Sequence, residues 1–288
     1  GAIPVLLKAG GERLVTGWFV ETMAAAAIRG KAIGPILVQK AREDLPLNLS
    51  LGQTAEMREL QHALGWKTVG ELPEYVFVTS SGIDLSSKFP RLLSRLGAHA
   101  LAWWHSIRLS RQSAELRRHY SVLTVERFNE EHDALWASME ESCCCTVVRD
   151  ASYLNWKYID RPKADFRIFE LREHGRLAGT AVVVVRNGGM PGAYPRGFIL
   201  DVIADLKNAR TLRALIAQCV IECRDLGAQS VTVGASQPSL ADALSDFGFI
   251  RRSGRYRFLV SLDIDGDSRE TLLQRSNWHL SYGDSDAA

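Results

Sequence analysis

The sequence has 288 residues, of which 46% are apolar and 24% charged, and its net charge is +2 at neutral pH. This length allows two domains of ordinary size, and the composition is that of a globular chain. The small net charge does not indicate a protein that binds polyanions through bulk charge, and no apolar run is long enough to predict a membrane-spanning helix.

The cysteines indicate a reducing compartment, which we expect to be the cytoplasm. There are five of them, an odd number that includes the adjacent triplet Cys143 to Cys145, and this is a poor disulfide framework. Cys219 and Cys223 are four residues apart on a predicted helix, but no second ligand pair or histidine lies near them in sequence. We therefore expect buried apolar thiols and no metal site.

The first 85 residues alternate between strand and helix signals. Ile3–Leu7 and Arg13–Thr22 flank a Gly10-Gly11 pair, which predicts a hairpin. A helix is expected from Pro35 to about Asp44, since proline is tolerated in a first helical turn. The residues expected on its buried face are Ile33, Ile36, Leu37 and Ala41.

The rest of this first segment predicts strand, helix and strand. Leu47–Leu51 alternates as a strand and ends at Gly52. Thr54 can cap a helix that ends at Gly65, and Tyr75–Thr79 is rich in β-forming residues.

Residues 86–119 differ because they are basic, with Glu115 as their one acid. They are predicted to form an amphipathic helix that joins two domains, or one that contacts an anionic membrane surface. No recognised RNA-binding motif is present, so a nucleic-acid partner is not expected. The residues expected on the apolar face are Leu92, Leu93, Leu96, Ala100, Trp103 and Trp104.

A second domain is expected over residues 120–265, followed by a C-terminal tail at 266–288 in which Asp284 and Asp286 are predicted to be solvated. The second domain repeats the order of the first. Strand Leu49–Leu51, Gly52, a helix and Gly65-Trp66 match strand Val231–Val233, Gly234, a helix and Gly248-Phe249. Such self-similarity predicts duplicated domains.

This order of elements resembles the C-terminal half of the GNAT acyltransferases. The resemblance implies an α/β fold of two tandem GNAT-like modules, each with a mixed, mostly antiparallel sheet and flanking helices. Residues 1–85 would form the first module, and it would be N-terminally incomplete because it has fewer residues before its loop than the second has.

One loop is a specific motif of this family. Arg29, Ala32 and Gly34 occupy the three key positions of its phosphate-binding loop, with Ala32 where glycine is usual. Small residues let backbone N–H groups approach a pyrophosphate, and the start of the next helix adds positive potential. The alternative is an ordinary loop before a helix, and the equivalent residues 205–210 contain no glycine. The residues expected to bind acetyl-CoA or another acyl-CoA are Arg29, Gly30, Lys31, Ala32, Ile33 and Gly34.

The resemblance implies transfer of an acyl group from a thioester to an amine, which requires a general base and an oxyanion donor. Glu21 is the candidate base. The tyrosine that many of these enzymes use is replaced by Gln61 in the first module and by Leu244 in the second. Two alternatives remain: a Fem-type transferase that uses aminoacyl-tRNA, and an inactive GNAT-like binding or scaffold protein.

The acceptor is expected to be a small-molecule or glycan-precursor amine, because residues 149–158 resemble a segment of GNAT-like proteins from bacterial cell-surface polysaccharide pathways. Aromatic faces beside polar groups suit an amino sugar. The alternative is a structural helix that anchors its aromatic residues in the core. The sequence does not indicate the oligomeric state. The candidate substrate residues are Arg149, Asn155, Trp156 and Tyr158.

Overall fold

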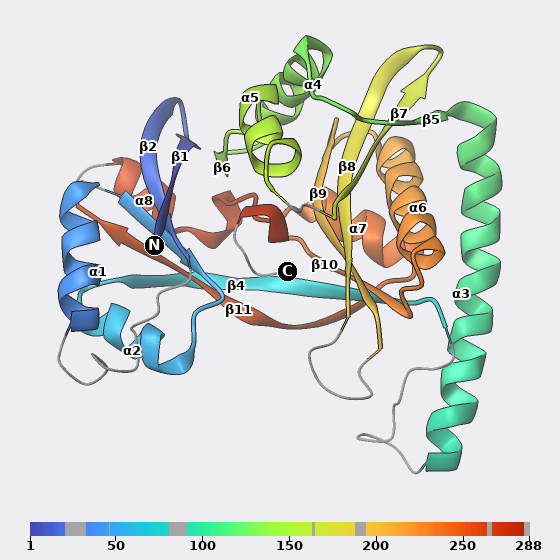
Figure 1. The fold of residues 1–288 in the computed structure, drawn as a ribbon, viewed down its shortest axis with the longest axis horizontal. Helices are drawn as coiled ribbons and strands as arrows, with labels where there is room; N and C mark the ends of the chain where they lie inside the picture. The colour runs from blue at the N-terminus through green and yellow to red at the C-terminus, as the bar shows by residue number, and fades with distance from the viewer. Residues whose placement is uncertain are drawn as a thin grey trace. The chain divides into compact units, whose positions relative to one another are not determined.

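The structure is a computed structural model that describes residues 1–20, 33–45, 47–80, 91–162, 165–187, 194–263 and 267–284 (Figure 1). The chain divides into two compact units made of separate stretches of sequence. Unit 1 comprises Gly1–Pro73, Cys143–Val148 and Ser253–Ala288, and unit 2 comprises Glu74–Ser142 and Arg149–Arg252. These units differ from the four consecutive segments expected from the sequence.

Unit 1 begins with the predicted hairpin, which is confirmed. β1 (Ala2–Ala9) pairs antiparallel with β2 (Glu12–Phe19) in the dark blue part of Figure 1. Gly10 in the turn has a φ of 61°, which glycine adopts without a steric penalty. β6 (Cys145–Val147) adds to the other edge of β1.

The sheet of unit 1 continues on the other side of the hairpin. β3 (Leu47–Leu51) matches the predicted strand and runs parallel to β2. On its other edge β3 pairs antiparallel with β11 (Ile250–Leu262), a strand from much later in the chain. Strands from both ends of the sequence therefore form one sheet.

Three α-helices of unit 1 are described: α1 (Ile33–Asp44), α2 (Ala55–Ala63) and α8 (Asp267–Leu273). The predicted cap of α2 is confirmed, because the Thr54 side chain accepts a hydrogen bond of 3.3 Å from the N–H of Met57. Gly65 follows this helix with a φ of 88°, as a helix-ending glycine does.

Unit 2 has the strand order β5–β7–β8–β9–β10, followed by the end of a strand from unit 1, β4 (Lys67–Val78). The described pairs are antiparallel except β9 with β10, which is parallel. The mixed, mostly antiparallel α/β class that was predicted is confirmed. The bounds are β5 (Ser121–Thr124), β7 (Arg167–Glu173), β8 (Arg176–Arg186), β9 (Arg196–Ala204) and β10 (Ser230–Gly234).

The helices of unit 2 include the longest of the described chain, α3 (Arg91–His119), which lies beside α6 in Figure 1. Cys219 and Cys223 are fully buried on α6, as expected. The other helices are α4 (Glu130–Glu140), α5 (Ala151–Leu154), the π-helix η2 (Asn155–Ile159), α6 (Ala209–Asp225) and α7 (Pro238–Phe247).

The two units exchange their last strands. β4 follows α2 of unit 1, but its residues Glu74–Val78 pair antiparallel with β10 of unit 2. β11 follows α7 of unit 2, but its residues Phe258–Leu262 pair antiparallel with β3 of unit 1. The strand predicted at Tyr75–Thr79 is therefore the end of a longer strand, and it completes the other unit.

One predicted helix face is wrong, and those residues of a second predicted apolar face that the structure describes are exposed. On α1, Ile36 and Leu37 are 64% and 53% exposed, whereas Val38 is fully buried. On α3, Trp103 and Trp104 are 67% and 43% exposed. In both helices the buried side is decided by the tertiary neighbours, and hydrophobicity along the sequence does not reveal those neighbours.

The predicted solvated tail is also wrong for the residues that the structure describes. Trp278 is buried, and its indole N–H donates a hydrogen bond of 2.8 Å to the carbonyl of Leu272. His279 N–H bonds the carbonyl of Cys145 at 2.8 Å. Asp284 is buried and accepts a hydrogen bond from the N–H of Ser281, so this segment belongs to the core of unit 1. Among the described residues, no helix is long and apolar enough to cross a bilayer.

Candidate functional site

The parallel strands β2 and β3 form the frame of the candidate coenzyme site in unit 1. Gly17, Trp18 and Phe19 pair in register with Asn48, Leu49 and Ser50. A parallel pair needs a crossover connection, and here that connection contains the predicted loop and α1. Thr16 donates a hydrogen bond of 2.7 Å to the carbonyl of Leu47, which ties the two strands together before they pair.

Only part of the predicted coenzyme loop lies among the described residues. Glu21 and the loop residues Arg29 to Ala32 lie outside them. Ile33 and Gly34 are described, and they are the first residues of α1. Among the described residues, none lies within 4 Å of a side chain added at Gly34, so they leave this side of the helix start open. The positive end of the helix macrodipole lies at the same place.

α1 is fixed to unit 1 through its middle and its end. Val38 packs in a buried cluster with Phe19, Trp66 and Leu259. Nη1 of Arg42, in the last turn, donates a hydrogen bond of 2.6 Å to the carbonyl of Leu64 at the end of α2. These contacts fix the middle and the C-terminal end of α1, whereas its N-terminal turn is not part of them.

Two glutamine side chains in unit 1 bury carboxamides with no hydrogen-bond partner among the described residues. Gln61 is fully buried on α2, and neither its oxygen nor its nitrogen is bonded. The same holds for both amide atoms of Gln53, between β3 and α2. The indole N–H groups of Trp18 and Trp66 are also buried without a partner. Unpaired buried polar groups are costly, so each of these groups is a place where a ligand or a water would be stabilising.

The sequence singled out Gln61 only because it stands where the family has tyrosine, and it gave no reason to select Gln53. A glutamine among the residues of a partly apolar helix is ordinary in a sequence. Only the burial and the missing hydrogen bonds of the folded chain distinguish these two side chains from the others.

In unit 2 the parallel strands β9 and β10 part from each other. They pair from Arg196 to Ile199, whereas β9 continues to Ala204. The register against β8 shifts at the same place, because Val182 pairs with Asp201 and Val183 with Ile199. Leu200 is therefore an extra residue, and the strand changes direction there.

The start of α6, which occupies the place of the loop in unit 2, satisfies its own N–H groups. The side chain of Asn208 accepts a hydrogen bond of 3.1 Å from the N–H of Thr211. The Asp205 carboxylate accepts one of 2.9 Å from the N–H of Lys207. These groups are thus occupied, and the carboxylate would repel a pyrophosphate.

The candidate substrate residues of unit 2 fall into two sets. Arg149 and Tyr158 meet at Asp201, and all three side chains are buried. The Arg149 Nε donates a hydrogen bond of 2.9 Å to one carboxylate oxygen of Asp201, and the Tyr158 hydroxyl donates to the other. Burial, followed by the Asp201 charge, raises the pKa of the Tyr158 hydroxyl.

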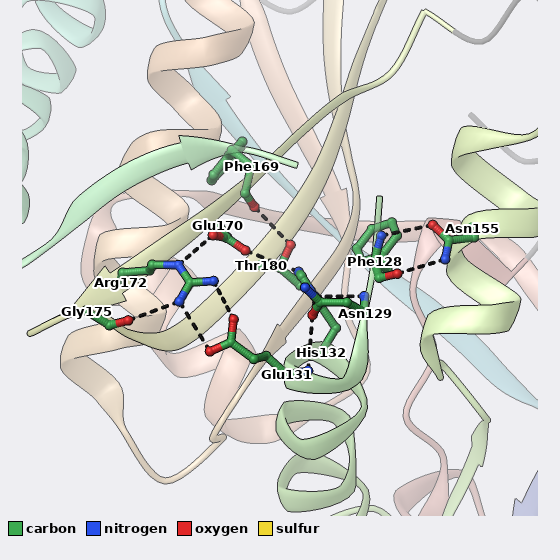
Figure 2. Close-up of polar contacts among 10 residues, drawn as sticks. All are labelled: Phe128, Asn129, Glu131, His132, Asn155, Phe169, Glu170, Arg172, Gly175 and Thr180. Atoms are coloured by element: carbon green, nitrogen blue, oxygen red, sulfur yellow. Dashed lines mark hydrogen bonds and ion pairs between the residues drawn. The ribbon is translucent and has the colours of Figure 1, made fainter. Parts of the chain in front are cut away.

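The other two candidates differ in exposure. Asn155 is buried, and its amide bonds both the N–H and the carbonyl of Phe128, at 2.9 and 3.0 Å (Figure 2). Trp156 is 52% exposed beside Tyr153, with ring centroids 5.7 Å apart. It lies on the π-helix η2, a rare element that is frequent at functional sites. Trp156 is therefore the one candidate whose aromatic face is available to a ligand.

An ionic cluster that the sequence did not predict, with His132 and Glu170 buried and Glu131 exposed, joins α4 to β7 (Figure 2). The His132 Nε2 is 3.3 Å from a carboxylate oxygen of Glu170, whose other oxygen accepts a hydrogen bond of 2.7 Å from Arg172. Arg172 also pairs with Glu131 at 2.6 Å. Burial is the largest cause that lowers the pKa of His132. The cluster connects the start of a helix to a strand, which is a structural role.

Comparisons with solved structures agree with this geometry. The chain superposes on an N-myristoyltransferase from Saccharomyces cerevisiae with bound myristoyl-CoA, with a TM-score of 0.60 and 10% identity over 90% of this chain. It also superposes on a GCN5-related N-acetyltransferase from Anabaena variabilis, with a TM-score of 0.57 and 13% identity over 92% of this chain. The chain has the GNAT fold. No protein-family model and no curated protein matches the sequence.

The GNAT fold of this chain corresponds to part of each of those proteins. The chain covers 65% of the myristoyltransferase and 59% of the acetyltransferase. A probable N-acyltransferase from Enterococcus faecalis, of unknown function, is similar with a TM-score of 0.54 and 12% identity, over 91% of this chain and 58% of that one. At these identities the likeness concerns the fold, so the chemistry must be argued from the residues.

Proposed function

We propose that this chain is an N-acyltransferase that takes its acyl group from acetyl-CoA or another acyl-CoA. The observation that carries the proposal is the parallel pair β2–β3, whose crossover contains the Arg29–Gly34 segment and leads into the open start of α1. Backbone N–H groups at such a helix start suit a pyrophosphate. The occupied N–H groups at the start of α6 favour unit 1 over unit 2 as the coenzyme site.

The reaction would be attack of a neutral amine on the thioester carbon, with the thiolate of coenzyme A as the leaving group. Glu21 is the proposed base that accepts the proton of the amine. The carboxamide of Gln61 offers two N–H donors in a buried site, where a hydrogen bond to a developing negative charge is stronger than in water. In this proposal Gln61 replaces the usual tyrosine as a donor, but it supplies no proton.

We propose an amino sugar or another cell-envelope precursor as the acceptor, bound through unit 2. The support is the exposed ring of Trp156 on η2, with Tyr153 beside it. A flat aromatic face packs against the C–H groups of a sugar ring. The ammonium of Lys157, which donates a hydrogen bond of 3.2 Å to the Tyr153 hydroxyl, places a cation beside the Tyr153 ring. The cysteines are all free thiols, which supports a reducing cytoplasm as the place of the reaction.

The test is calorimetric titration of the protein with acetyl-CoA. We expect binding by the wild-type chain and loss of binding in Gly34→Asp, because a carboxylate at the helix start would repel the pyrophosphate. Gly11→Asp is the matched control, since Gly11 lies in the β1–β2 turn and also has nothing within 4 Å of an added side chain. This control should bind as the wild type does.

The two alternatives give other results. A Fem-type transferase would bind aminoacyl-tRNA and would not bind acetyl-CoA. An inactive scaffold would bind neither, and Gly34→Asp would then change nothing. Unchanged affinity of Gly34→Asp for acetyl-CoA would place the coenzyme site elsewhere in the chain.

A further inference from the structure

Among the side chains of helix α3 that the structure describes, the buried ones lie along one side of the helix. Its buried side chains include His105, Leu109 and Leu116. The His105 ring stacks on Phe77 at 4.0 Å between centroids, and its Nδ1 lies 2.9 Å from the carbonyl of Val78. With 29 residues the helix is about 43 Å long, so its other side is a long surface.

The opposite side of α3 carries an exposed tryptophan. Trp103 is 67% exposed, and the exposed residues Ser110, Ala114 and Arg117 follow it at intervals of seven, four and three residues. These intervals place all four on one helix face. The last three also border a pocket whose other wall includes Arg224 and Asp225 of α6. Trp104 differs from Trp103, because the Arg108 guanidinium lies over its ring at 4.6 Å and itself bonds the carbonyl of Asp246.

Three arginines surround this face. Arg111, Arg117 and Arg118 are exposed, and none of them has a hydrogen bond or ion pair with any described residue. The one acidic residue of the helix is Glu115. Arg127, another exposed arginine of unit 2, is by contrast paired with Asp160.

We propose that this face of α3 docks on a lipid bilayer that carries anionic headgroups. The unpaired guanidinium groups supply the charge that such a surface attracts, and the attraction is about 1 kcal/mol per basic residue near the membrane. Trp103 supplies an indole, which prefers the boundary between headgroups and acyl chains. A nucleic acid would also attract the arginines, but an indole that is 67% exposed beside small residues favours the lipid interface.

The test is co-sedimentation of the full chain with vesicles of phosphatidylcholine containing about a third phosphatidylglycerol, compared with pure phosphatidylcholine. We expect binding to the anionic vesicles and release at high salt. The variant R111Q/R117Q/R118Q should bind roughly 100-fold more weakly, since each arginine contributes about a fivefold factor. Trp103→Ala should also bind more weakly, by a factor that changes little as salt is raised over the range in which the wild type still binds.

Two control variants remove the same number of charges and the same type of aromatic ring from other surfaces of the protein. R167Q/R176Q/R251Q removes three exposed arginines outside α3, and Trp156→Ala removes an exposed tryptophan elsewhere in unit 2. Both should bind as the wild type does. Equal loss in the control triple variant would mean that bulk charge acts, and it would overturn the proposal. Binding to RNA with no binding to anionic vesicles would overturn it as well.

Discussion

Arg149 and Asp201 form a buried ion pair in unit 2, with the guanidinium Nε 2.9 Å from a carboxylate oxygen although the residues are 52 positions apart. Both side chains are almost wholly inaccessible to water. The second carboxylate oxygen accepts the hydroxyl of Tyr158. The three groups therefore connect residues 149–158 to the bulged strand β9. Because the Arg149 and Asp201 charges are both removed from water, each is stabilised by the other.

Loss of this carboxylate should destabilise the protein strongly. We expect Asp201→Asn to lower the free energy of unfolding by about 3–5 kcal/mol, because the buried Arg149 charge loses the carboxylate that pairs with it. Chemical denaturation measures the change. Asp160→Asn is the control, since Asp160 pairs with Arg127 at the surface and should matter little. Similar losses in both variants would contradict this account of the buried pair.

Stability should fall on mild acidification, in part because of His132. Burial lowers its pKa in the folded state, so the unfolded chain binds a proton more readily. The free energy of unfolding should therefore decrease as the pH falls below the ordinary histidine pKa of about 6.5. His132→Gln keeps a side chain that can cap α4, and it should show a shallower decrease between pH 7 and 5. A slope as steep as that of the wild type would exclude His132 as a source.

The unpartnered carboxamide of Gln61 should cost stability in the free protein. Gln61→Leu has a similar volume, and we expect it to raise the free energy of unfolding by about 1 kcal/mol while it weakens the binding of acetyl-CoA. Gln218→Leu is the matched control, because Gln218 is also buried but donates a hydrogen bond of 2.8 Å to Glu222. It should lose stability and keep its affinity. Destabilisation by Gln61→Leu would show that its amide is satisfied in solution.

Trp156 should affect the acceptor and leave the coenzyme alone. In a transfer assay with an amino-sugar acceptor, Trp156→Ala should raise the KM for the amine roughly tenfold or more. Its melting temperature and its affinity for acetyl-CoA should stay near the wild-type values, because the ring is half exposed. Trp103→Ala, at a more exposed site on α3, should leave this KM unchanged. A normal KM for Trp156→Ala would remove η2 from the acceptor site.

Local signals in the sequence predicted many elements correctly. The Gly10-Gly11 turn, the strand Leu47–Leu51 and the Thr54 cap were found because turn and cap chemistry acts over a few residues. The mixed α/β class followed from the order of these elements. The coenzyme loop stays a prediction, since Arg29 to Ala32 lie outside the described residues.

Features that depend on distant parts of the chain were missed. No signal in the sequence identifies Asp201 as the partner of Arg149, or Glu170 as the partner of His132. Val38 is buried in place of Ile36 because Phe19, Trp66 and Leu259 pack on that side of α1. Pairings across such separations arise only when the sheet assembles.

The strand exchange has a consequence for synthesis on the ribosome. The first strands of unit 1 are among the earliest residues translated, yet β3 gains its neighbour β11 only after the whole of unit 2 has been made. An emerging chain would hold the edge of β3 unpaired throughout that time, exposed to aggregation or to a chaperone. Unit 2 should reach its native form first. Unit 1, whose first strands are translated earliest, should be the last to fold.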